Sequence, residues 1–590
     1  MLRQVQRVLK HYYGYDSLRP GQDEVITSLL SGRDTVAIMP TGAGKSLCFQ
    51  LPALLLPGVT IVITPLISLM KDQVDSLEGQ GIAATYINSS LSAQETGNRL
   101  YHMRNGHYRL LYVAPERLEN EAFQQLLTDM PVSLVAVDEA HCVSQWGHDF
   151  RPSYRYIAPF IAGLASRPVV GAFTATATPE VKADICRLLD LQNACVYVTG
   201  FDRPNLRFTV LRGEDKERYV INYARINASQ AGIIYAATRK DVDALYDSLN
   251  RAGIQAGRYH AGLSDEERRH WQEAFLYDRV RVMAATNAFG MGIDKSNVRF
   301  VIHYHMPKNM EAYYQEAGRS GRDGEPGDCI LLYGPQDVML QKFLIEKSVE
   351  DPRRKQHELQ KLRQMVEYVH LSGCLRSFIL RYFGESGAPG ECGNCGNCCD
   401  DGEKTDITED ACKVFSCISH MKERFGLSLV AEVLKGSRSK KVRQYGFESL
   451  PTFGVMAGHS LPDIRTIIQR LAASDYLCLT DGLYPVVRLA PQARAVLGSQ
   501  ARVWQKTAAV RSRAENDDTL FETLRQLRRR LAEEAGVPPF VVFADSVLWE
   551  LCRQQPVTVE DLRRIKGIGE VKLERYGPAF LAAIRSHASP

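Results

Sequence analysis

The chain has 590 residues, of which 45% are hydrophobic and 24% charged, and its formal net charge is +4. Domains average about 150 residues, so this length predicts roughly four domains and excludes a single compact core. The composition excludes collagenous and disordered classes, and no apolar run reaches the roughly 18 residues that a membrane span needs. Because the N-terminus has no signal-peptide core, we expect a cytoplasmic protein without a membrane partner.

The first half of the chain has the rhythm of an α/β protein. Short β-branched runs such as TVAIMP, VTIVITP and SLVAVDEAH alternate with helical segments up to about Asp190. Such runs are typical of buried parallel strands. The rhythm restarts after residues 201–205 with AGIIYAAT, VRVMAAT and DCILLYG, which predicts two α/β lobes in tandem.

A glycine-rich loop, TGAGKS, begins at Thr41 between the strand TVAIMP and a helical segment. This order of strand, loop and helix is typical of phosphate cradles. Gly42 and Gly44 let backbone amides approach phosphates, Lys45 supplies a cation, and Ser46 offers a Mg²⁺ ligand. An ordinary glycine-rich turn is the alternative interpretation.

An acidic pair, Asp138 and Glu139, ends a second apolar strand in VAVDEAH. One carboxylate can hold Mg²⁺ while its neighbour polarises the attacking water. The pair therefore favours the phosphate-cradle interpretation of TGAGKS. His141 could have a purely structural role or could relay the state of the bound nucleotide.

The segment CVSQWGHDFRPSY follows the acidic pair and mixes aromatic residues with arginine. This mixture suits stacking on single-stranded bases combined with phosphate pairing. The residues concerned are Trp146, His148, Phe150, Arg151 and Tyr154. The alternative is that Trp146 and Phe150 belong to the core of the first lobe.

Between residues 335 and 381 the pattern becomes helical, and a cysteine cluster follows it. Cys392, Cys395, Cys398 and Cys399 crowd together, whereas most other cysteines are isolated. In a reducing compartment this crowding indicates a metal site instead of disulfides. A set of reactive thiols is the alternative.

The remaining sequence predicts two smaller domains. A helix in DIRTIIQRLAASD precedes two strands that flank Asp481 and Gly482, which suggests a winged helix. Two basic clusters could bind phosphates or form solvated helix faces. The clusters are Arg438, Lys440, Lys441 and Arg443, and then Arg525, Arg528, Arg529 and Arg530.

Six motifs follow one another along the chain in the order TGAGKS, PLISLMKDQ, DEAHCVSQWGHDFRP, FTATAT, FGMGIDK and QEAGRSGRDG. With these motifs in this order, the chain resembles the RecQ family of superfamily-2 DNA helicases over nearly its whole length. The resemblance implies an ATP- and Mg²⁺-dependent motor that moves 3′ to 5′ on single-stranded, duplex and branched DNA. It implies work in recombination, repair and replication-fork maintenance, a bacterial nucleoid-associated location, and contact with single-stranded-DNA-binding protein as a further partner. An RNA-dependent ATPase of a related class and a non-motor DNA-binding module are the alternatives.

The resemblance also assigns residues around the nucleotide. In YGYDSLRPGQ, Tyr15 and Arg19 would sandwich adenine and Gln22 would read its edge, although Tyr15 could instead belong to the core. In QEAGRSGRDG, Arg322 is favoured as an arginine finger, while Arg319 would form an ion pair or bind phosphate less directly. Gly292 and Asp294 would lie at the same cleft, and Thr174 and Thr176 would bridge the nucleotide and DNA sites.

In the family the aromatic-rich loop links DNA binding to hydrolysis, and four thiolates bind one structural Zn²⁺. The matching cysteines here are Cys374, Cys392, Cys395 and Cys398. Cys399 is an extra thiol that either competes for the fourth position or is idle. In the C-terminal segment, the turn at Gly567 to Gly569 could present amides to phosphate or serve as an ordinary helix cap.

We therefore expect an α/β protein with two tandem RecA-like lobes and parallel sheets, then a helical zinc-binding module, a winged-helix domain and a small all-α C-terminal domain of the helicase-and-RNaseD type (HRDC). The expected ranges are 1–200 and 201–340 for the lobes, 341–402 for zinc, 403–500 for the winged helix, 501–515 for a linker and 516–590 for the last domain.

Overall fold

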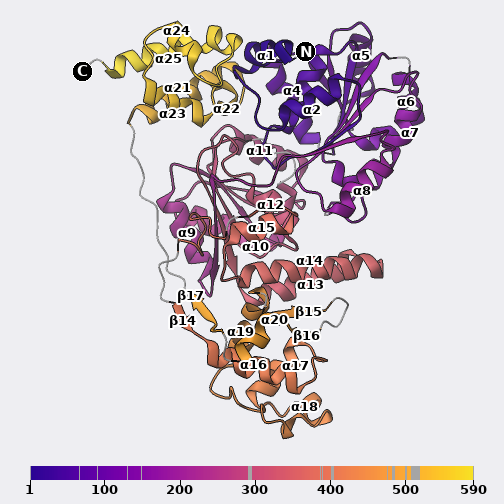
Figure 1. The fold of residues 1–590 in the computed structure, drawn as a ribbon. Coiled ribbons are helices and arrows are strands. Elements are labelled where there is room, and N and C mark those ends of the chain that lie inside the picture. Colours follow the sequence, from indigo (N-terminus) through magenta and orange to yellow (C-terminus); the bar gives the residue numbers. More distant parts are fainter. Residues whose placement is uncertain are drawn as a thin grey trace.

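The computed structural model describes residues 2–65, 67–88, 91–128, 130–147, 149–289, 295–385, 387–388, 390–399, 404–474, 476–480, 486–498, 501–506 and 519–588. His148, Gly292, Asp294 and the predicted turn at Asp481 and Gly482 lie outside them. Figure 1 shows the C-terminal domain beside the first lobe, the second lobe in the middle and the winged-helix region at the far end.

The first lobe is built on a seven-stranded sheet in the order β3-β4-β2-β5-β6-β1-β7, in which all neighbouring strands are parallel. Strands β1, β2 and β4 are buried along their whole length, which explains why their sequences are continuously apolar. The strands are β1 Thr35–Ile38, β2 Val59–Ile63, β3 Ala84–Ile87, β4 Leu110–Val113, β5 Val132–Val137, β6 Val169–Thr174 and β7 Cys195–Val198.

The second lobe has a six-stranded parallel sheet in the order β10-β11-β9-β12-β13-β8. Its strands are β8 Leu206–Arg212, β9 Ala231–Tyr235, β10 Ala256–Tyr259, β11 Val282–Ala285, β12 Val298–His303 and β13 Gly327–Tyr333. The prediction of two tandem α/β lobes is therefore confirmed.

Helices cover both sheets (Figure 1). In the first lobe they are α1 Leu2–Val8, α2 Gln22–Leu30, α3 Lys45–Leu55, α4 Ile67–Glu78, α5 Ala93–Arg104, α6 Glu121–Thr128, α7 Ile157–Ala162 and α8 Pro179–Leu188, with a π-helix η1 at Leu9–Tyr13. In the second lobe they are α9 Lys216–Ile226, α10 Arg239–Arg251, α11 Asp265–Leu276 and α12 Met310–Ala317. Several start at reciprocal caps, as at Ser264 and Glu267 of α11, which satisfy free amides of the first turn.

The zinc-binding region consists of α13 Pro335–Ser348, α14 Pro352–His370 and α15 Leu375–Tyr382, followed by the cysteine-bearing loop. Along α14, Leu362 and Val369 are buried while Leu359 and Val366 are partly buried against the same core. This pattern confirms the helical segment predicted there and makes α14 amphipathic.

The winged-helix region has its own hydrophobic core. Its elements are β14 Lys404–Asp406, α16 Thr408–His420, α17 Leu427–Lys435, α18 Lys440–Gln444, α19 Leu461–Ala473, β15 Leu477–Leu479, β16 Val487–Leu489, α20 Pro491–Leu497 and β17 Trp504–Lys506. Strands β15 and β16 pair antiparallel after α19, as the sequence predicted. Strand β17 pairs with β14 and lies within the range expected to be linker.

The C-terminal domain is all-helical, with α21 Thr519–Ala535, α22 Pro539–Val542, α23 Asp545–Gln554, α24 Val559–Arg564 and α25 Glu570–Ala588. Its arginine cluster is not a continuous basic surface. Arg528 has no exposed surface, and its guanidinium donates to Asp545 Oδ1 and to the carbonyl of Phe543, each at 2.8 Å. Arg529 and Arg530 pair with glutamates one turn along α21.

The C-terminal domain also contacts both lobes. The Gly567 amide donates to the carbonyl of Gly14 at 3.2 Å in the first lobe. In the second lobe, Tyr277 donates to the carbonyl of Gly536 at 3.1 Å, and Arg525 donates to the carbonyl of Ser229 at 2.6 Å. In this arrangement the Gly567 amide is engaged by protein and is not open to a phosphate.

Candidate active site and metal centre

The residues predicted to hold a nucleotide line one cavity of about 910 Å³ between the two lobes. Its wall includes the residues predicted to bind adenine, phosphates or Mg²⁺ and the predicted catalytic residues. These are Tyr15, Arg19, Gln22, Thr41, Gly42, Gly44, Lys45, Ser46, Asp138, Glu139, Arg319 and Arg322. The volume is within the usual range of ligand pockets, about 300 to 1,000 Å³.

Adjacent strands of the first sheet converge on this cavity. Strand β1 leads into TGAGKS, β5 ends before Asp138, and β6 ends at Thr174, and these three strands are neighbours in the sheet. Because parallel strands end at the same edge, residues far apart in sequence meet there. The helix α3 begins at Lys45, so its N-terminal amides face the site.

The TGAGKS loop needs its glycines. Gly42 and Gly44 have φ of +84° and +86°, in the left-handed region that favours glycine. A Cβ on Gly44 would also lie 2.5 Å from Nε2 of Gln22. Gln22 donates to the carbonyl of Ala43 at 2.9 Å, and Arg19 donates to the carbonyl of Gly42. The predicted adenine-reading residues therefore also support the loop itself.

Lys45 and the acidic pair form the charged centre of the cavity. Lys45 donates to the carbonyl of Met39 at 3.3 Å, and burial lowers its pKa. Burial and the neighbouring charge of Glu139 raise the pKa of Asp138 to about 7, while Lys45 opposes this rise. A bound divalent cation would favour the ionised carboxylate, so Asp138 suits the Mg²⁺ role.

His141 connects the acidic pair to FTATAT. It is buried, and burial lowers its pKa to about 4, so the ring is neutral at pH 7. Nδ1 lies 2.9 Å from Oγ1 of Thr174 and 3.4 Å from a carboxylate oxygen of Glu139. The Thr174 hydroxyl donates to the carbonyl of Thr176. These contacts place His141 between Glu139 of the acidic pair and Thr174 of FTATAT.

The two arginines of QEAGRSGRDG reach the cavity from the second lobe. Arg319 is 5% exposed, and its charge opposes the rise that burial causes in the pKa of Tyr235. Arg322 stands near Lys45, whose pKa its charge helps to lower. The backbone of Arg322 also approaches the phosphate loop, since a Cβ on Gly42 would lie 3.4 Å from the Cα of Arg322.

The aromatic-rich loop lies against α14 of the zinc-binding region. The ring of Trp146 is edge-on to His357 at 5.3 Å, and the backbone oxygen of Trp146 accepts from Lys361 at 3.0 Å. The guanidinium groups of Arg155 and Arg354 lie 5.3 and 5.6 Å from the centre of the Phe150 ring.

The loop is not simply core. Trp146 is 36% exposed, whereas Tyr154 is fully buried and its hydroxyl donates to the carbonyl of Asp138 at 2.8 Å. Arg151 pairs with Asp149 at 3.1 Å and donates to the carbonyl of Pro65 at 2.9 Å. Its guanidinium is thus already bound within the first lobe, although the sequence assigned it to DNA.

We expect Trp146→Ala and Phe150→Ala to lower DNA-stimulated ATP hydrolysis more than DNA-independent hydrolysis, because base stacking would be sensed through the loop that follows Asp138 and Glu139. Steady-state ATPase assays with and without single-stranded DNA measure both rates. Tyr156→Ala, which changes an exposed aromatic beyond the loop, is the control. Equal losses with and without DNA would mean that the rings only support the core.

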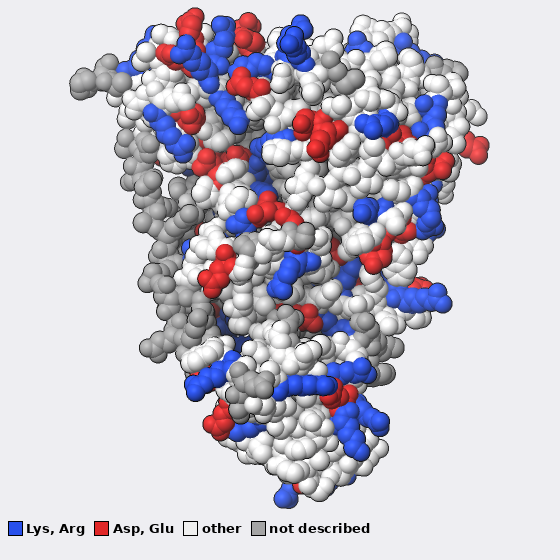
Figure 2. Space-filling model, viewed as in Figure 1, with Lys and Arg blue, Asp and Glu red and all other residues white. Residues whose placement is uncertain are grey.

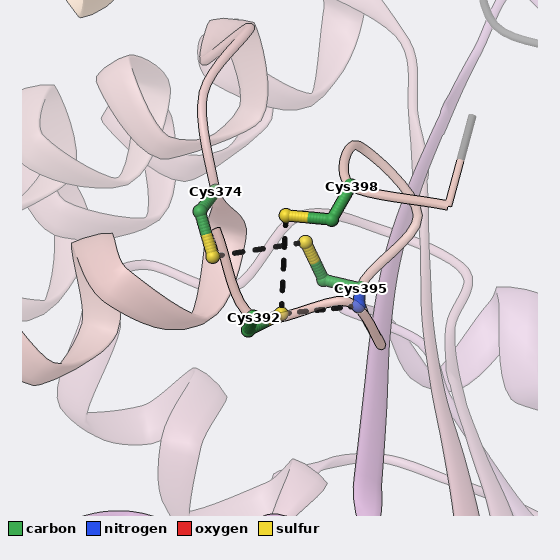
Figure 3. Close-up of side chains that lie close together, drawn as sticks. All are labelled: Cys374, Cys392, Cys395 and Cys398. Atoms are coloured by element: carbon green, nitrogen blue, oxygen red, sulfur yellow. Dashed lines mark hydrogen bonds between the residues drawn. The ribbon is translucent and has the colours of Figure 1, made fainter. Parts of the chain in front are cut away.

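Four cysteines form the candidate metal centre (Figure 3). The Sγ atoms of Cys374, Cys392, Cys395 and Cys398 all lie within 4.8 Å of one another. Two pairs, Cys392 with Cys398 and Cys374 with Cys395, are 4.0 Å apart. A tetrahedral zinc with Zn–S bonds of about 2.3 Å places its thiolates at roughly this separation. The residues present therefore fit a structural zinc ion.

Cys399 stands apart from that group. Its thiol is exposed and donates to the carbonyl of Gly393 at 3.2 Å. The four-cysteine group does not contain it. The structure therefore favours an idle fifth thiol.

Each of Cys374→Ser, Cys392→Ser, Cys395→Ser and Cys398→Ser should lower zinc content and thermal stability, because a structural site binds tightly when its ligand set is complete. Cys399→Ser should leave both near wild type. Metal analysis of the purified variants and thermal denaturation test this. A zinc loss in Cys399→Ser equal to that in Cys398→Ser would place the extra thiol among the ligands.

The predicted basic cluster of the winged-helix region lies at the surface. Arg438, Lys440, Lys441 and Arg443 are exposed on and before α18, while Val442 anchors this short helix in the core. Figure 2 shows Lys and Arg side chains gathered over this end of the molecule. The cluster can contribute a salt-dependent attraction to DNA phosphates.

One side of the nucleotide cavity was not foreseen from the sequence. Residues of the C-terminal domain line it, including Ser546, Glu550, Arg553 and Lys566. No local motif marks these positions, since they reach the cavity only because the last domain packs against both lobes.

Known protein families match this chain in the same domain order as the structure. Family models match as a DEAD/DEAH box helicase at residues 19–184, a helicase conserved C-terminal domain at 215–324, RecQ zinc-binding at 335–399, an RQC domain at 401–514 and an HRDC domain at 517–584. The ATP-dependent DNA helicase RecQ of Bacillus subtilis is 51% identical over 589 residues, which cover 100% of this chain and 99% of the relative. The chain belongs to the RecQ family.

Two further RecQ relatives agree over nearly the whole length. The ATP-dependent DNA helicase RecQ of Haemophilus influenzae is 39% identical, covering 98% of this chain and 95% of the relative. That of Pasteurella multocida is 40% identical, covering 98% and 93%. As a RecQ protein the chain is an ATP-dependent DNA helicase that uses ATP with Mg²⁺ and binds one structural zinc ion. No described helix is long and apolar enough to span a membrane.

Proposed function

We propose that this RecQ helicase translocates 3′ to 5′ on single-stranded DNA and unwinds duplex and branched DNA in recombination, repair and replication-fork maintenance. One observation carries the motor mechanism: the phosphate loop and acidic pair of one lobe face two arginines of the other across a single cavity. Such a site is complete only when the lobes close, so hydrolysis can be coupled to their relative movement.

We assign the following roles at the nucleotide. Tyr15 and Arg19 flank the base, and the amides of the loop from Thr41 to Ser46 hold the phosphates. Lys45 binds the β and γ phosphates as a cation, and Ser46 and Asp138 are the protein ligands for Mg²⁺. When bound there, Mg²⁺ would supply positive charge next to the phosphate oxygens.

The acid–base and charge roles are divided between the lobes. Glu139 orients the attacking water and accepts its proton. Arg322 neutralises charge on the transferring phosphoryl group, as an arginine finger does. Arg319, buried near Tyr235, supports nucleotide or DNA binding.

DNA reaches this centre through the aromatic-rich loop. Trp146 and Phe150 stack on single-stranded bases, and their contacts with α14 would change when DNA binds. Helix α14 packs against α19 of the winged helix, and Arg363 on it donates to the carbonyl of Thr480 at 2.9 Å. Duplex phosphates would bind the exposed basic cluster at α18.

The direction is tested by strand separation on duplexes with a 3′ or a 5′ single-stranded tail. We expect ATP-dependent unwinding of the 3′-tailed duplex and little of the 5′-tailed one. Preference for the 5′ tail would reverse the direction. ATPase stimulation by single-stranded RNA equal to that by DNA of the same length would instead support an RNA-dependent motor.

Three further assignments rest on the RecQ family. The domain ranges given from the sequence remain our proposed boundaries, except that the winged-helix domain extends past residue 500 to include β17, because this strand pairs with β14. We also propose a cytoplasmic, nucleoid-associated location and a contact with single-stranded-DNA-binding protein. Co-purification of the two proteins from DNase-treated extract would test that contact.

A further inference from the structure

Arg203 lies in the segment between β7 and β8, where the chain crosses from the first lobe to the second. Its guanidinium donates hydrogen bonds to backbone carbonyls of both lobes. The acceptors are Thr41 in the phosphate loop, Gly318 at 3.3 Å, Ser320 at 3.1 Å and Gly321 at 2.8 Å. The last three belong to the turn that carries Arg319 and Arg322, so one side chain joins the two halves of the active site.

The contact between these parts is close. A Cβ on Gly42 would lie 3.2 Å from Nη1 of Arg203 and 3.4 Å from the Cα of Arg322. The phosphate loop, Arg203 and the backbone of the arginine turn are therefore packed so closely that a side chain at Gly42 would have to displace its neighbours. A shift of Arg203 would therefore displace both the phosphate loop and the turn that carries Arg322.

The partners of Arg203 are unusual for a largely buried guanidinium. Buried charges are commonly paired with an opposite charge, yet among the described residues Arg203 has carbonyl and amide oxygens as its partners and forms no ion pair. Burial lowers its pKa, and the charges of Arg322 and Arg19 act in the same direction. Five N–H groups in a fixed planar fork suit several carbonyls at once, which a lysine ammonium does not.

The segment that carries Arg203 is itself held in place. Nδ2 of Asn205 donates to the carbonyls of Gly321 and Glu325 at 2.9 and 2.8 Å, and its Oδ1 accepts from Nε of Arg203 at 3.4 Å. On the other side, Phe201 stacks on Phe383 of the zinc-binding region at 4.6 Å.

The zinc-binding loop adds a further contact to this segment. Nδ2 of Asn394, which lies between Cys392 and Cys395, donates to the carbonyl of Pro204 at 3.1 Å. The zinc-binding region thus fixes the crossing segment from which Arg203 extends into the active site.

We propose that Arg203 is a positioning residue for ATP hydrolysis, which fixes the arginine turn against the phosphate loop and acts through Arg322. This inference rests on the proposed role of Arg322 as the finger. Hydrolysis depends on where that guanidinium stands relative to the γ-phosphate, and a misplacement of about 1 Å can cost roughly 10²-fold in rate. Without Arg203, the turn loses three of the hydrogen bonds that hold it.

A double-mutant cycle tests the proposal. Arg203→Ala, Arg322→Ala and the double variant are assayed for ATP turnover at saturating single-stranded DNA. We expect Arg203→Ala to lower kcat by about 10²-fold with little change in the KM for ATP. The double variant should turn over no more slowly than Arg322→Ala alone, because the effect of Arg203 passes through Arg322. A merely structural loss would add to that of Arg322→Ala.

Controls separate folding from positioning. Zinc content and thermal denaturation are measured for each variant, and Arg218→Ala removes an exposed arginine from α9 of the same lobe. If Arg203→Ala does not fold, Arg203→Lys is used in the same cycle, since it keeps the charge and loses the planar fork. Full turnover in that lysine variant would overturn the proposal.

The remaining outcomes are equally decisive. Losses that multiply in the double variant would show that Arg203 acts independently of Arg322 and overturn the inference while leaving the finger intact. A raised KM with unchanged kcat would make Arg203 a nucleotide contact instead. Wild-type turnover in Arg322→Ala alone would remove the proposed finger, and this single variant identifies that failure separately.

Discussion

Lys45→Ala should abolish ATP hydrolysis while DNA binding and zinc content stay near wild type. The side chain points into a cavity at the start of α3, next to Asp138 and Glu139, and it supplies a cation for the β and γ phosphates. Burial lowers the pKa of Lys45, while the neighbouring carboxylates of Glu139 and Asp138 oppose this shift. Turnover with and without DNA, together with DNA binding by fluorescence anisotropy, measures the effect.

The matched control for this substitution is Arg187→Ala, which removes a cation that is 70% exposed on α8 of the same lobe. Surface pairs of this kind contribute little to stability, so turnover should be unchanged. Hydrolysis retained by Lys45→Ala would contradict the assignment of the cavity as the ATPase site. Loss of zinc in that variant would point to misfolding, because the metal centre belongs to another region.

Arg322→Ala should keep ATP affinity near wild type and lower DNA-stimulated turnover by about 10³-fold or more, the scale typical of arginine fingers. Lys45 and Glu139 belong to the first lobe and Arg322 to the second, so the finger makes hydrolysis conditional on lobe closure. The position of Arg322 is consistent with this role, since its charge contributes to lowering the pKa of Lys45. ATP affinity is measured with a fluorescent analogue and turnover at saturating single-stranded DNA.

Arg319→Ala is the informative comparison, because it removes the same group from the same turn. Its side chain is nearly buried beside Tyr235, so we expect it to weaken nucleotide or DNA binding as much as turnover. If Arg322→Ala chiefly weakens ATP binding and Arg319→Ala chiefly lowers turnover, the two roles are exchanged.

The sequence was most informative where the chemistry needs neighbouring residues. A phosphate loop requires glycines, a lysine and a hydroxyl in one short run, and the structure places TGAGKS between β1 and α3 with both glycines in the left-handed region. The spacing marked Cys392, Cys395 and Cys398, and the resemblance to the RecQ family added Cys374, which is the N-cap of α15; the fold brings these four thiols together. The phosphate loop and three of the four thiols are each encoded over a few residues, so pattern and site coincide there.

Individual side chains were harder to assign than motifs. Arg528 belongs to a charged helix and looked like part of a basic surface, yet it is fully buried on Asp545. Arg151 was assigned to DNA and is bound by Asp149 and the carbonyl of Pro65. Residue type gives a charge, but its partner and exposure depend on packing between distant segments.

The sequence by itself predicted the two α/β lobes, the helix and two strands of the winged-helix region, the phosphate loop and three closely spaced zinc-site cysteines, because buried strands, helices and ligand loops leave local patterns. Cys374 and the adenine and arginine assignments came from the resemblance to the RecQ family. Only the tertiary structure revealed that the C-terminal domain closes one side of the nucleotide cavity and that Arg203 joins the phosphate loop to the arginine turn. Those contacts use backbone carbonyls and surfaces hundreds of residues apart. Every residue has a carbonyl, so no sequence pattern marks which of them a distant guanidinium will bind.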